Sequence, residues 1–219
     1  MDEYLIREAE KKDIPFIADT VIAAEKGRSD KLSFSTLFNV PEGKAKELIM
    51  TMLEEEIDGC ELSLSSFLVA EYKGEAVAAI GSWIEGFDGA MPSKILKSNL
   101  ILHTFETGSM EFFKTKSHIV KDVFIEREPL TLQFEYLHIA DKHLGKGLDT
   151  ELVKRSEANA LAKYPGLKKV QTQLFKNNIL AVIVLRKKGF NVVSSCKSNN
   201  EEIGNYIPFN EKLLMEKSL

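Results

Sequence analysis

The stretch HIADKHLGKGLDTELVKRSE, residues 138–157, joins the end of an apolar, strand-like segment to the start of a helix. Between the two lies a turn that contains Gly145 and Gly147. A helix N-terminus presents unpaired N–H groups and a positive dipole end, and glycines let an anion approach the backbone closely. The stretch therefore predicts a phosphate-binding strand–turn–helix unit. The alternative is a tight connection that binds no ligand.

Two common phosphate-binding patterns do not fit this turn. A Walker loop ends in Gly-Lys followed by Ser or Thr, whereas Lys146 is followed by Gly147, and Ala140 stands where the first glycine belongs. A dinucleotide fingerprint has a third glycine, and Thr150 occupies that position. If the turn binds phosphate, it is a loop of another kind.

The rest of the chain alternates between strand and helix patterns. The C-terminal half follows the order strand, helix, strand, helix, strand, which indicates an α/β fold with at least one right-handed parallel crossover. We expect a single domain over residues 1–219, with an insertion at about 86–130 that contains two helix patterns. The other expected elements are strands at 3–8, 67–72, 75–84, 132–140, 168–175 and 190–196, a last strand near 205–214, and helices from Ile14 and at 41–57, 149–163 and 179–188.

Local signals predict where some of these elements begin and how closely they pack. Asp13 precedes the first helix and is expected to cap it, with Pro15 in the first turn and Gly27 as its end. The strand at 75–84 is rich in small residues and includes Gly81, which suggests that another part of the chain packs closely against it.

Two motifs in this order resemble those of the GNAT (Gcn5-related N-acetyltransferase) superfamily. In that family a pyrophosphate loop follows an apolar strand and opens a helix, and residues 144–149, LGKGLD, fall on this loop without a gap when Ile139 takes the strand position. The second motif is matched by Asn178 and Ala181, followed by the pair Gly189-Phe190. The order of elements also fits the family over the whole chain apart from the insertion.

The resemblance implies a fold, a cofactor and a set of binding residues. The fold is α/β, with a mixed, mostly antiparallel central sheet, a parallel crossover at the cofactor cleft, and helices on both faces. The cofactor is acetyl-CoA, whose pyrophosphate meets the backbone of residues 145–150 and whose pantetheine arm pairs with strand residues 137–139 and meets Asn178. The expected binding residues are Leu137, His138, Ile139, Leu144, Gly145, Lys146, Gly147, Leu148, Asp149, Thr150, Asn178 and Ala181.

Three positions depart from the family pattern. Leu144 stands where the family usually has Arg or Gln, and Asp149 stands where it has Gly or Ala. A carboxylate repels a pyrophosphate, so we expect Lys146 to offset Asp149. Leu185 replaces the Tyr that protonates the leaving thiolate in many members, and leucine cannot donate a proton. The general acid then lies elsewhere or is water, and the alternative function is a coenzyme A-binding protein without turnover.

Glu135 and His138 are the candidate catalytic residues. An amine acceptor must lose a proton, and a carboxylate or imidazole near the acetyl group can take it. The two residues lie three positions apart on a strand, so they face opposite sides unless a bulge, typical of this family, intervenes. The alternative is that Glu135 is a solvated or ion-paired residue and His138 a neutral structural one.

The acceptor is expected to be a small-molecule or peptide amine that attacks the thioester directly, because no cysteine is placed as a covalent relay. The charges of the insertion are mixed and do not select among acceptors. Four aromatic residues could line the acceptor pocket or belong to the core: Trp83, Phe105, Phe112 and Phe113.

Composition excludes several other classes of protein. The net charge of −4 argues against a dedicated nucleic-acid partner. The four histidines lack metal-ligand spacing, so no metal is expected, and Cys60 and Cys196 are expected to be free thiols. No apolar run approaches the ~20 residues that span a membrane, and the charged N-terminus has no signal core, which predicts a cytoplasmic location. A homodimer is possible.

Overall fold

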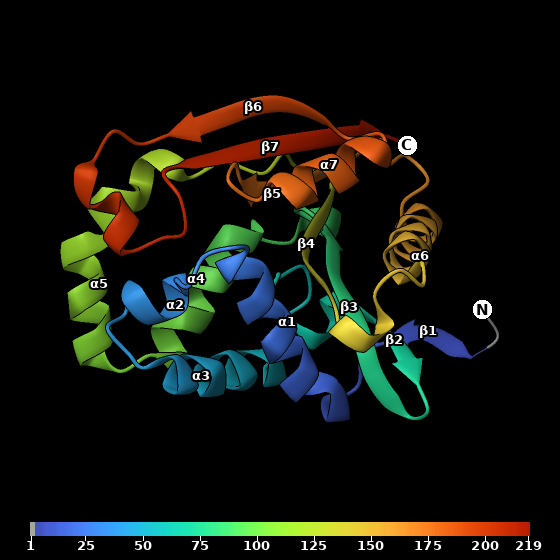
Figure 1. Ribbon diagram of the computed structural model, residues 1–219, viewed down its shortest axis with the longest axis horizontal. Coiled ribbons are helices and arrows are strands. Elements are labelled where there is room, and N and C mark those ends of the chain that lie inside the picture. The colour runs from blue at the N-terminus through green and yellow to red at the C-terminus, as the bar shows by residue number, and fades with distance from the viewer. Residues whose placement is uncertain (1–2) are drawn as a thin grey trace.

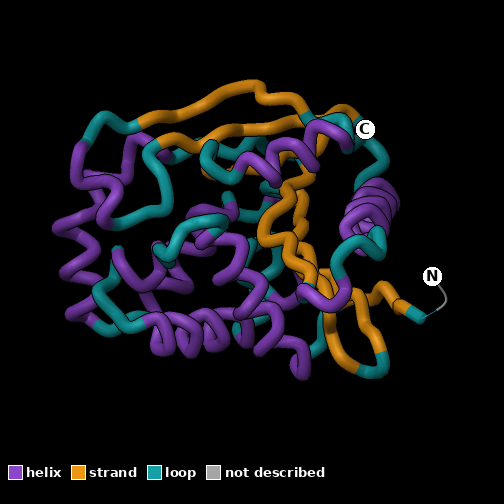
Figure 2. Tube along the Cα trace, in the orientation of Figure 1, coloured by secondary structure: helices purple, strands orange, loops and turns teal. Residues whose placement is uncertain are grey.

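The computed structural model describes residues 3–219 and contains a mixed seven-stranded sheet with the order β1-β2-β3-β4-β5-β7-β6 (Figures 1 and 2). Every neighbouring pair is antiparallel except β4 and β5, which are parallel. The expected mostly antiparallel sheet with one parallel crossover is therefore confirmed. The strands are β1 (Tyr4–Glu8), β2 (Phe67–Tyr72), β3 (Glu75–Ile84), β4 (Leu132–Ile139), β5 (Lys169–Phe175), β6 (Asn191–Lys197) and β7 (Glu211–Ser218).

Helices cover both faces of the sheet, as predicted (Figure 1). The α-helices are α1 (Ile14–Lys26), α2 (Ser33–Thr36), α3 (Glu42–Glu54), α4 (Ser93–Thr104), α5 (Thr107–Val120), α6 (Leu148–Lys163) and α7 (Ile179–Lys187). Short 3-10 turns are η1 (Lys11–Asp13), η2 (Leu64–Ser66), η3 (Phe87–Gly89), η4 (Lys121–Val123), η5 (Asp141–His143) and η6 (Glu201–Asn205). None of the helices within residues 3–219 combines the length and the apolar character needed to cross a membrane.

Two apolar clusters hold the sheet between these helices. One cluster joins α1, α3 and α4 to the sheet, and it includes Ile17, Ile49 and Tyr136. The other joins α6 to the opposite face, and it includes Phe134 and Leu152. Because side chains alternate along a strand, β4 contributes to both clusters and runs through the middle of the molecule.

A bulge interrupts β4 at its midpoint. Gly81 of β3 pairs with Glu135, and Ala79 pairs with His138, so one β3 residue faces two residues of β4. Tyr136 occupies the bulge with φ 55°, a left-handed conformation that is uncommon for a non-glycine residue. An added Cβ on Gly81 would lie 3.2 Å from the backbone oxygen of Glu135, which confirms the close approach expected for this strand.

β4 and β5 separate just after they begin to pair. Their parallel register covers three residue pairs, from Leu132 with Val170 to Phe134 with Thr172. Beyond this point the β5-facing edge of β4, residues 135–139, has no strand partner on that side in the described structure. The separation opens a gap in the middle of the sheet, at the point where the bulge lies.

Three local predictions were wrong. The last strand, expected near 205–214, is β7 and begins only at Glu211. Pro208 lacks an N–H group and cannot belong to a strand that is paired on both sides. The second helix ends at Glu54, before Glu56 adopts φ 46°. Asp13 stands at the start of α1, but its carboxylate makes no cap bond to that helix; it accepts from the Glu10 backbone N–H at 2.8 Å and pairs with Arg7 at 2.6 Å.

Candidate functional site

The glycine turn lies at the start of α6 with its backbone open. Gly145 and Gly147 have φ values of 72° and 75°, and nothing lies within 4 Å of a Cβ built on either residue. Within residues 3–219, no carbonyl or side-chain oxygen accepts a hydrogen bond from the N–H groups of Gly145, Lys146 or Gly147. Open N–H groups at a helix start fit a pyrophosphate, so the turn suits the phosphate part of a cofactor.

A lysine from another helix compensates the acidic residue of this turn. Lys188, just after α7, pairs with the Asp149 carboxylate at 2.7 Å and donates to Thr150 Oγ1 at 2.7 Å. The cation that balances Asp149 is thus Lys188 and not Lys146, because α7 packs beside the first turn of α6. Leu144 is exposed, with 57% of its surface accessible.

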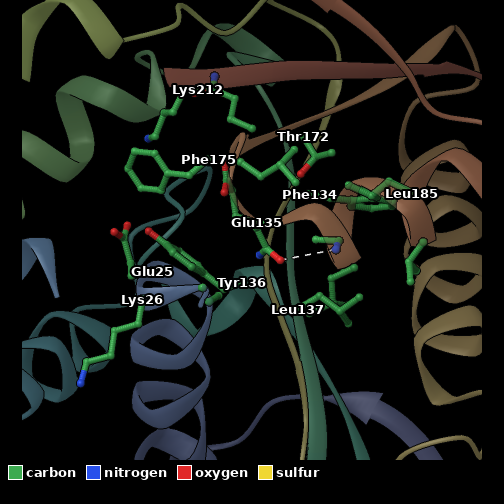
Figure 3. A pocket seen from close by; sticks show the side chains of 18 of the residues that line it. Glu25, Lys26, Phe134, Glu135, Tyr136, Leu137, Thr172, Phe175, Leu185 and Lys212 are labelled. Carbon is green, nitrogen blue, oxygen red and sulfur yellow. Dashed lines mark hydrogen bonds between the residues drawn. The ribbon is translucent and has the colours of Figure 1, made fainter. Parts of the chain in front are cut away.

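A cavity of about 200 Å³ occupies the gap between β4 and β5 (Figure 3). Its walls come from the C-terminal end of α1, the bulged part of β4, the end of β5, and one side of α7. Among the residues predicted from the sequence, Glu135, Leu137, Asn178 and Ala181 line this cavity. Other lining residues include Glu25, Lys26, Phe134, Tyr136, Thr172, Phe175, Leu185 and Lys212.

Asn178 lines the cavity from the start of α7. It is the N-cap of α7, and its side-chain oxygen accepts from the backbone N–H of Ala181 at 3.4 Å, which confirms its capping role. A Cβ on Gly27 would lie 3.5 Å from Asn178 Nδ2, so the end of α1 reaches the start of α7. A contact between Asn178 and a cofactor stays a prediction.

Glu135 points into the cavity and is ion-paired. Its side chain is 14% exposed, and its Oε1 lies 3.1 Å from Nη2 of Arg127. Burial raises the pKa of Glu135, although the Arg127 charge opposes that rise. A carboxyl group whose pKa is raised toward neutrality is suited to accept a proton.

His138 lies on the same side of the sheet but outside the cavity wall. Its ring stands 6.2 Å from the ring of Phe16 in α1, and burial lowers its pKa. The bulge at Tyr136 therefore turns Glu135 and His138 toward the same face, as the sequence analysis required for a joint role. Only Glu135 lines the cavity.

The aromatic residues considered for an acceptor pocket are elsewhere. Trp83 and Phe105 are buried, Phe112 and Phe113 are half-buried, and none of the four lines the cavity. The aromatic walls of the cavity are Phe134, Tyr136 and Phe175, which lie on the two separating strands. Their strand positions were predicted, but the separation that exposes them was not.

The charged residues that surround Glu135 were not predicted from the sequence. Arg127 lies just before β4, and Glu61 lies between α3 and η2. Glu61 is 2% exposed and contacts Nη2 of Arg127 at 2.6 Å. The one sign of this cluster in the sequence is the carboxylate of Glu61 within the mostly apolar segment CELSL, residues 60–64. A charged side chain that is buried with such a segment needs a partner of opposite charge.

Comparisons with known proteins agree with this geometry at the level of the fold. No protein-family profile and no curated protein sequence matches the chain. The chain is similar in structure to an N-acetyltransferase from Staphylococcus aureus Mu50, with a TM-score of 0.65, 13% identity, and coverage of 97% of this chain and 99% of that one.

Two further similar structures have named acceptors. An agmatine N-acetyltransferase matches with a TM-score of 0.54, 13% identity and complete coverage of both chains, 100% each. A ribosomal-protein-alanine N-acetyltransferase from Brucella melitensis matches with a TM-score of 0.53, 16% identity, and coverage of 98% and 99%. The expected fold is confirmed: this chain shares the fold of the acetyltransferases named above and of an acetyltransferase of the GNAT family from Streptococcus pneumoniae.

Proposed function

We propose that the protein is an acetyl-CoA-dependent N-acetyltransferase that moves an acetyl group to a primary amine by direct attack in a ternary complex. One observation carries this proposal. The cavity between β4 and β5 holds a largely buried carboxylate, Glu135, beside a bulge, and the capped start of α7 also lines it.

The residues of the site fit the parts of acetyl-CoA. The N–H groups of residues 145–149 would hold the pyrophosphate, since the glycines leave the backbone uncovered. The N–H of Thr150, which the sequence also predicted to contribute, donates to the Gly147 carbonyl at 3.0 Å instead. The free edge of β4 at residues 137–139 offers backbone groups to the pantetheine amides, and Leu137 and Ala181 offer apolar contacts. When bound, the cofactor supplies an activated acetyl thioester.

Glu135 would take the proton of the acceptor amine. A lysine-like amine is almost entirely protonated at neutral pH, because its pKa is about 10.4. A carboxylate beside it, acting as a general base, lowers this barrier to attack. Leu185 lines the cavity but cannot protonate the leaving thiolate, and water serves that role because a thiol, with a pKa of about 8.5, is a fair leaving group.

The cysteines support direct attack without an acyl-enzyme. Cys60 is buried outside the cavity, and burial raises its pKa to about 11, which keeps the thiol protonated and unreactive at neutral pH. Cys196 lies on β6, away from the cavity walls. The acceptor class is a small-molecule or peptide amine, and the similar structures named above include one of each kind.

A second candidate function rests on Leu144 and Leu185. With no basic residue at 144 and no proton donor at 185, the chain would bind coenzyme A as a regulatory module without turnover. Two measurements separate the candidates. Calorimetry with coenzyme A reports binding, and thiol release from acetyl-CoA with a panel of primary amines reports transfer. Binding with no transfer across the panel would favour the second candidate.

The proposal that the turn with Gly145 and Gly147 binds coenzyme A can be tested against a matched control glycine, Gly59. Gly147 and Gly59 share φ 75°, and nothing lies within 4 Å of a Cβ on either. Gly147→Val and Gly59→Val therefore introduce comparable backbone strain. We expect Gly147→Val to weaken coenzyme A binding at least tenfold, about 1.4 kcal/mol, and Gly59→Val to leave it unchanged. Equal dissociation constants in both folded variants would remove the turn from the site.

A further inference from the structure

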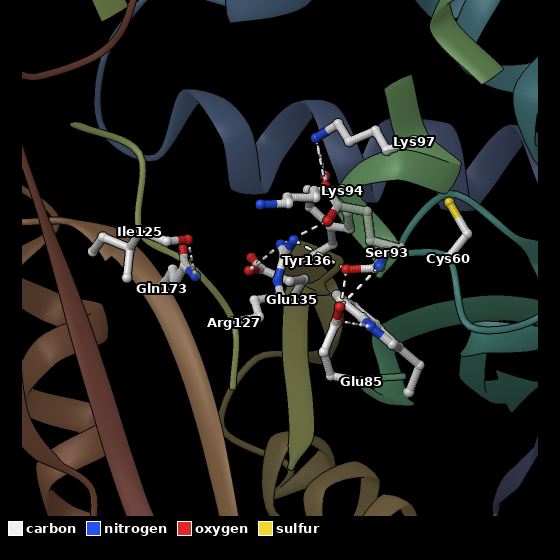
Figure 4. Close-up of polar contacts among 12 residues, drawn as sticks. Cys60, Glu85, Ser93, Lys94, Lys97, Ile125, Arg127, Glu135, Tyr136 and Gln173 are labelled. Atoms are coloured by element: carbon white, nitrogen blue, oxygen red, sulfur yellow. Dashed lines mark hydrogen bonds and ion pairs between the residues drawn. The ribbon is translucent and has the colours of Figure 1, made fainter. Parts of the chain in front are cut away.

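A cluster of five charged and polar side chains lies behind the bulge of β4 (Figure 4). Arg127, Glu135, Tyr136 and Lys97 meet there around Glu61, which is almost fully buried. These residues come from four different parts of the chain: the loop after α3, helix α4, the segment before β4, and β4 itself. The proposed reaction uses only one of them, Glu135.

Glu61 connects the cluster through both of its oxygens. Its Oε1 accepts from the hydroxyl of Tyr136 at 3.0 Å and forms a short contact with Nζ of Lys97. Its Oε2 lies 2.6 Å from Nη2 of Arg127. These three partners hold the pKa of Glu61 low, at about 2, against the effect of its burial.

A single nitrogen of Arg127 contacts two carboxylates. Nη2 contacts both Glu61 at 2.6 Å and Glu135 at 3.1 Å, while Nε is buried without a hydrogen-bond partner. Nη1 donates to Ser93 Oγ at 3.3 Å, and the guanidinium stacks 5.0 Å from the centre of the Trp83 ring. The planar fork of arginine can pair with a carboxylate through two parallel bonds, and neither carboxylate here receives both.

The two carboxylates therefore compete for the same cation. Glu61 has Lys97 and Tyr136 as additional partners, whereas Glu135 has the more distant charge of Lys212 in β7. No other titratable group contacts Glu135 among residues 3–219, although Tyr136 lies next to it in the chain. Glu135 is thus the less compensated of the two, and it is the one that faces the cavity.

Glu61 also binds the side chain of Tyr136, the residue with strained backbone at the bulge. The left-handed backbone conformation costs a non-glycine residue about 1–3 kcal/mol of folding free energy. Tyr136, with φ 55°, adopts this conformation at the bulge. Its ring stacks on Phe67 at 6.4 Å with an interplanar angle of 11°, and its hydroxyl is bound by Glu61. Glu61 therefore links the position of the bulge to the charge beside Glu135.

We propose that Glu61 and Arg127 are positioning residues that set the protonation state of Glu135 from behind the bulge, with Arg127 favouring the carboxylate and Glu61 opposing it. The catalytic consequence rests on the proposed function, but the electrostatic linkage does not. If Glu135 is the base, this linkage decides the pH at which it can accept a proton from the amine.

The linkage is tested by NMR titration of the full-length protein labelled with ¹³C at the glutamate carboxyl groups, without acceptor. The Glu135 signal is assigned by its absence in Glu135→Gln. We expect Arg127→Gln to raise the titration midpoint of Glu135 by about one pH unit or more, because an opposite charge is lost. Glu61→Gln should lower the midpoint, because a like charge is lost and Arg127 is left to Glu135 alone.

Arg7→Gln is the matched control. Arg7 is as buried as Arg127 and also joins two carboxylates, but it lies at β1, away from the cavity. It should leave the Glu135 midpoint unchanged. If Arg127→Gln does not fold, Glu61→Gln alone decides the matter. An unchanged or raised midpoint in folded Glu61→Gln overturns the proposal.

The same variants then separate this linkage from the proposed reaction. With acetyl-CoA and an amine that the panel identifies, the acidic limb of kcat/KM against pH should move in the same direction as the Glu135 midpoint. Shifted midpoints with no transfer to any amine would leave the linkage standing and reject the enzymatic function. An acidic limb that does not follow the midpoint would reject the catalytic consequence of the linkage.

Discussion

Two arginines of similar burial organise this molecule, and they use their charge differently. Arg7 on β1 is 14% exposed, and Arg127 before β4 is 13% exposed. Arg7 gives Nη1 and Nη2 to Asp13 at 2.6 and 3.0 Å, and it gives Nε to Glu71 at 2.7 Å. Arg127 instead brings one nitrogen to two carboxylates and leaves Nε without a partner.

The difference appears in the carboxylates. Asp13 and Glu71 both have lowered pKa values, because Arg7 hydrogen-bonds each of them through separate nitrogens. Around Arg127 the pKa is lowered for Glu61 but raised for Glu135. The guanidinium of Arg7 thus lowers the pKa of both its partners, whereas the shared guanidinium of Arg127 does not overcome the effect of burial on Glu135, which is left poised to bind a proton. The second arrangement lies beside the cavity, and the first lies on β1 and β2, which contribute no residue to the cavity wall.

The largest expected effect is on the free energy of unfolding, at the ion pair between Arg7 and Asp13. Arg7→Gln leaves the buried Asp13 carboxylate without its cation, and breaking such a pair costs about 3–5 kcal/mol. Urea unfolding at neutral pH measures this loss. Lys12→Gln, which removes an exposed partner of Glu71, should cost less than about 1 kcal/mol. A loss below 1 kcal/mol for Arg7→Gln would contradict the stabilising role of this ion pair.

The second-largest expected effect is on kcat, at the carboxylate of Glu135. Glu135→Gln should lower kcat at neutral pH by about a hundredfold, with partial recovery as the pH rises toward the pKa of the acceptor amine. Glu71→Gln, a carboxylate on the other arginine, should leave kcat unchanged. Steady-state rates with acetyl-CoA across pH provide the measurement. A Glu135→Gln enzyme with the wild-type rate and pH profile would end the claim for Glu135, and His138 would become the candidate base.

Asp13 and Glu135 should also give stability opposite dependences on pH. The lowered pKa of Asp13 contributes stability that is present above its ordinary value of 3.8 and is lost as the pH falls through the folded-state pKa. The raised pKa of Glu135 contributes stability that is present below 4.5 and is lost as the pH rises. The stability difference between wild type and Asp13→Asn should therefore grow with pH, and the difference for Glu135→Gln should shrink. Equal slopes in urea unfolding across pH would contradict this contrast.

The smallest effect is expected at a third ion pair, which is more exposed. Lys188 pairs with Asp149 beside the glycine turn, with 16% and 28% of the side chains exposed. Asp149→Gly frees Lys188 for a phosphate and should tighten coenzyme A binding by a few-fold, most clearly at low salt. Glu151→Gln, in the same turn of α6, is the control, because Glu151 pairs with the exposed Lys154. Weaker binding in Asp149→Gly would mean that Asp149 chiefly stabilises the helix start.

The features that the sequence alone determined are local ones. The turn with Gly145 and Gly147, the cap at Asn178 and the order of strands and helices follow from backbone preferences and from the spacing of apolar residues. Each of these depends on residues within a few positions of one another. The fold class could therefore be predicted, together with the open turn before α6 and the cap of α7.

The tertiary structure alone decided which charges meet. Arg127, in the insertion, and Glu61, after α3, reach Glu135 only when β4, α4 and the loop after α3 pack together. Likewise, Lys188 and not Lys146 balances Asp149, because α7 lies beside α6. Electrostatic effects depend on distance through space and on burial, which local sequence patterns do not encode. For that reason Glu135 could be named from the sequence, but the partners that set its protonation state could not.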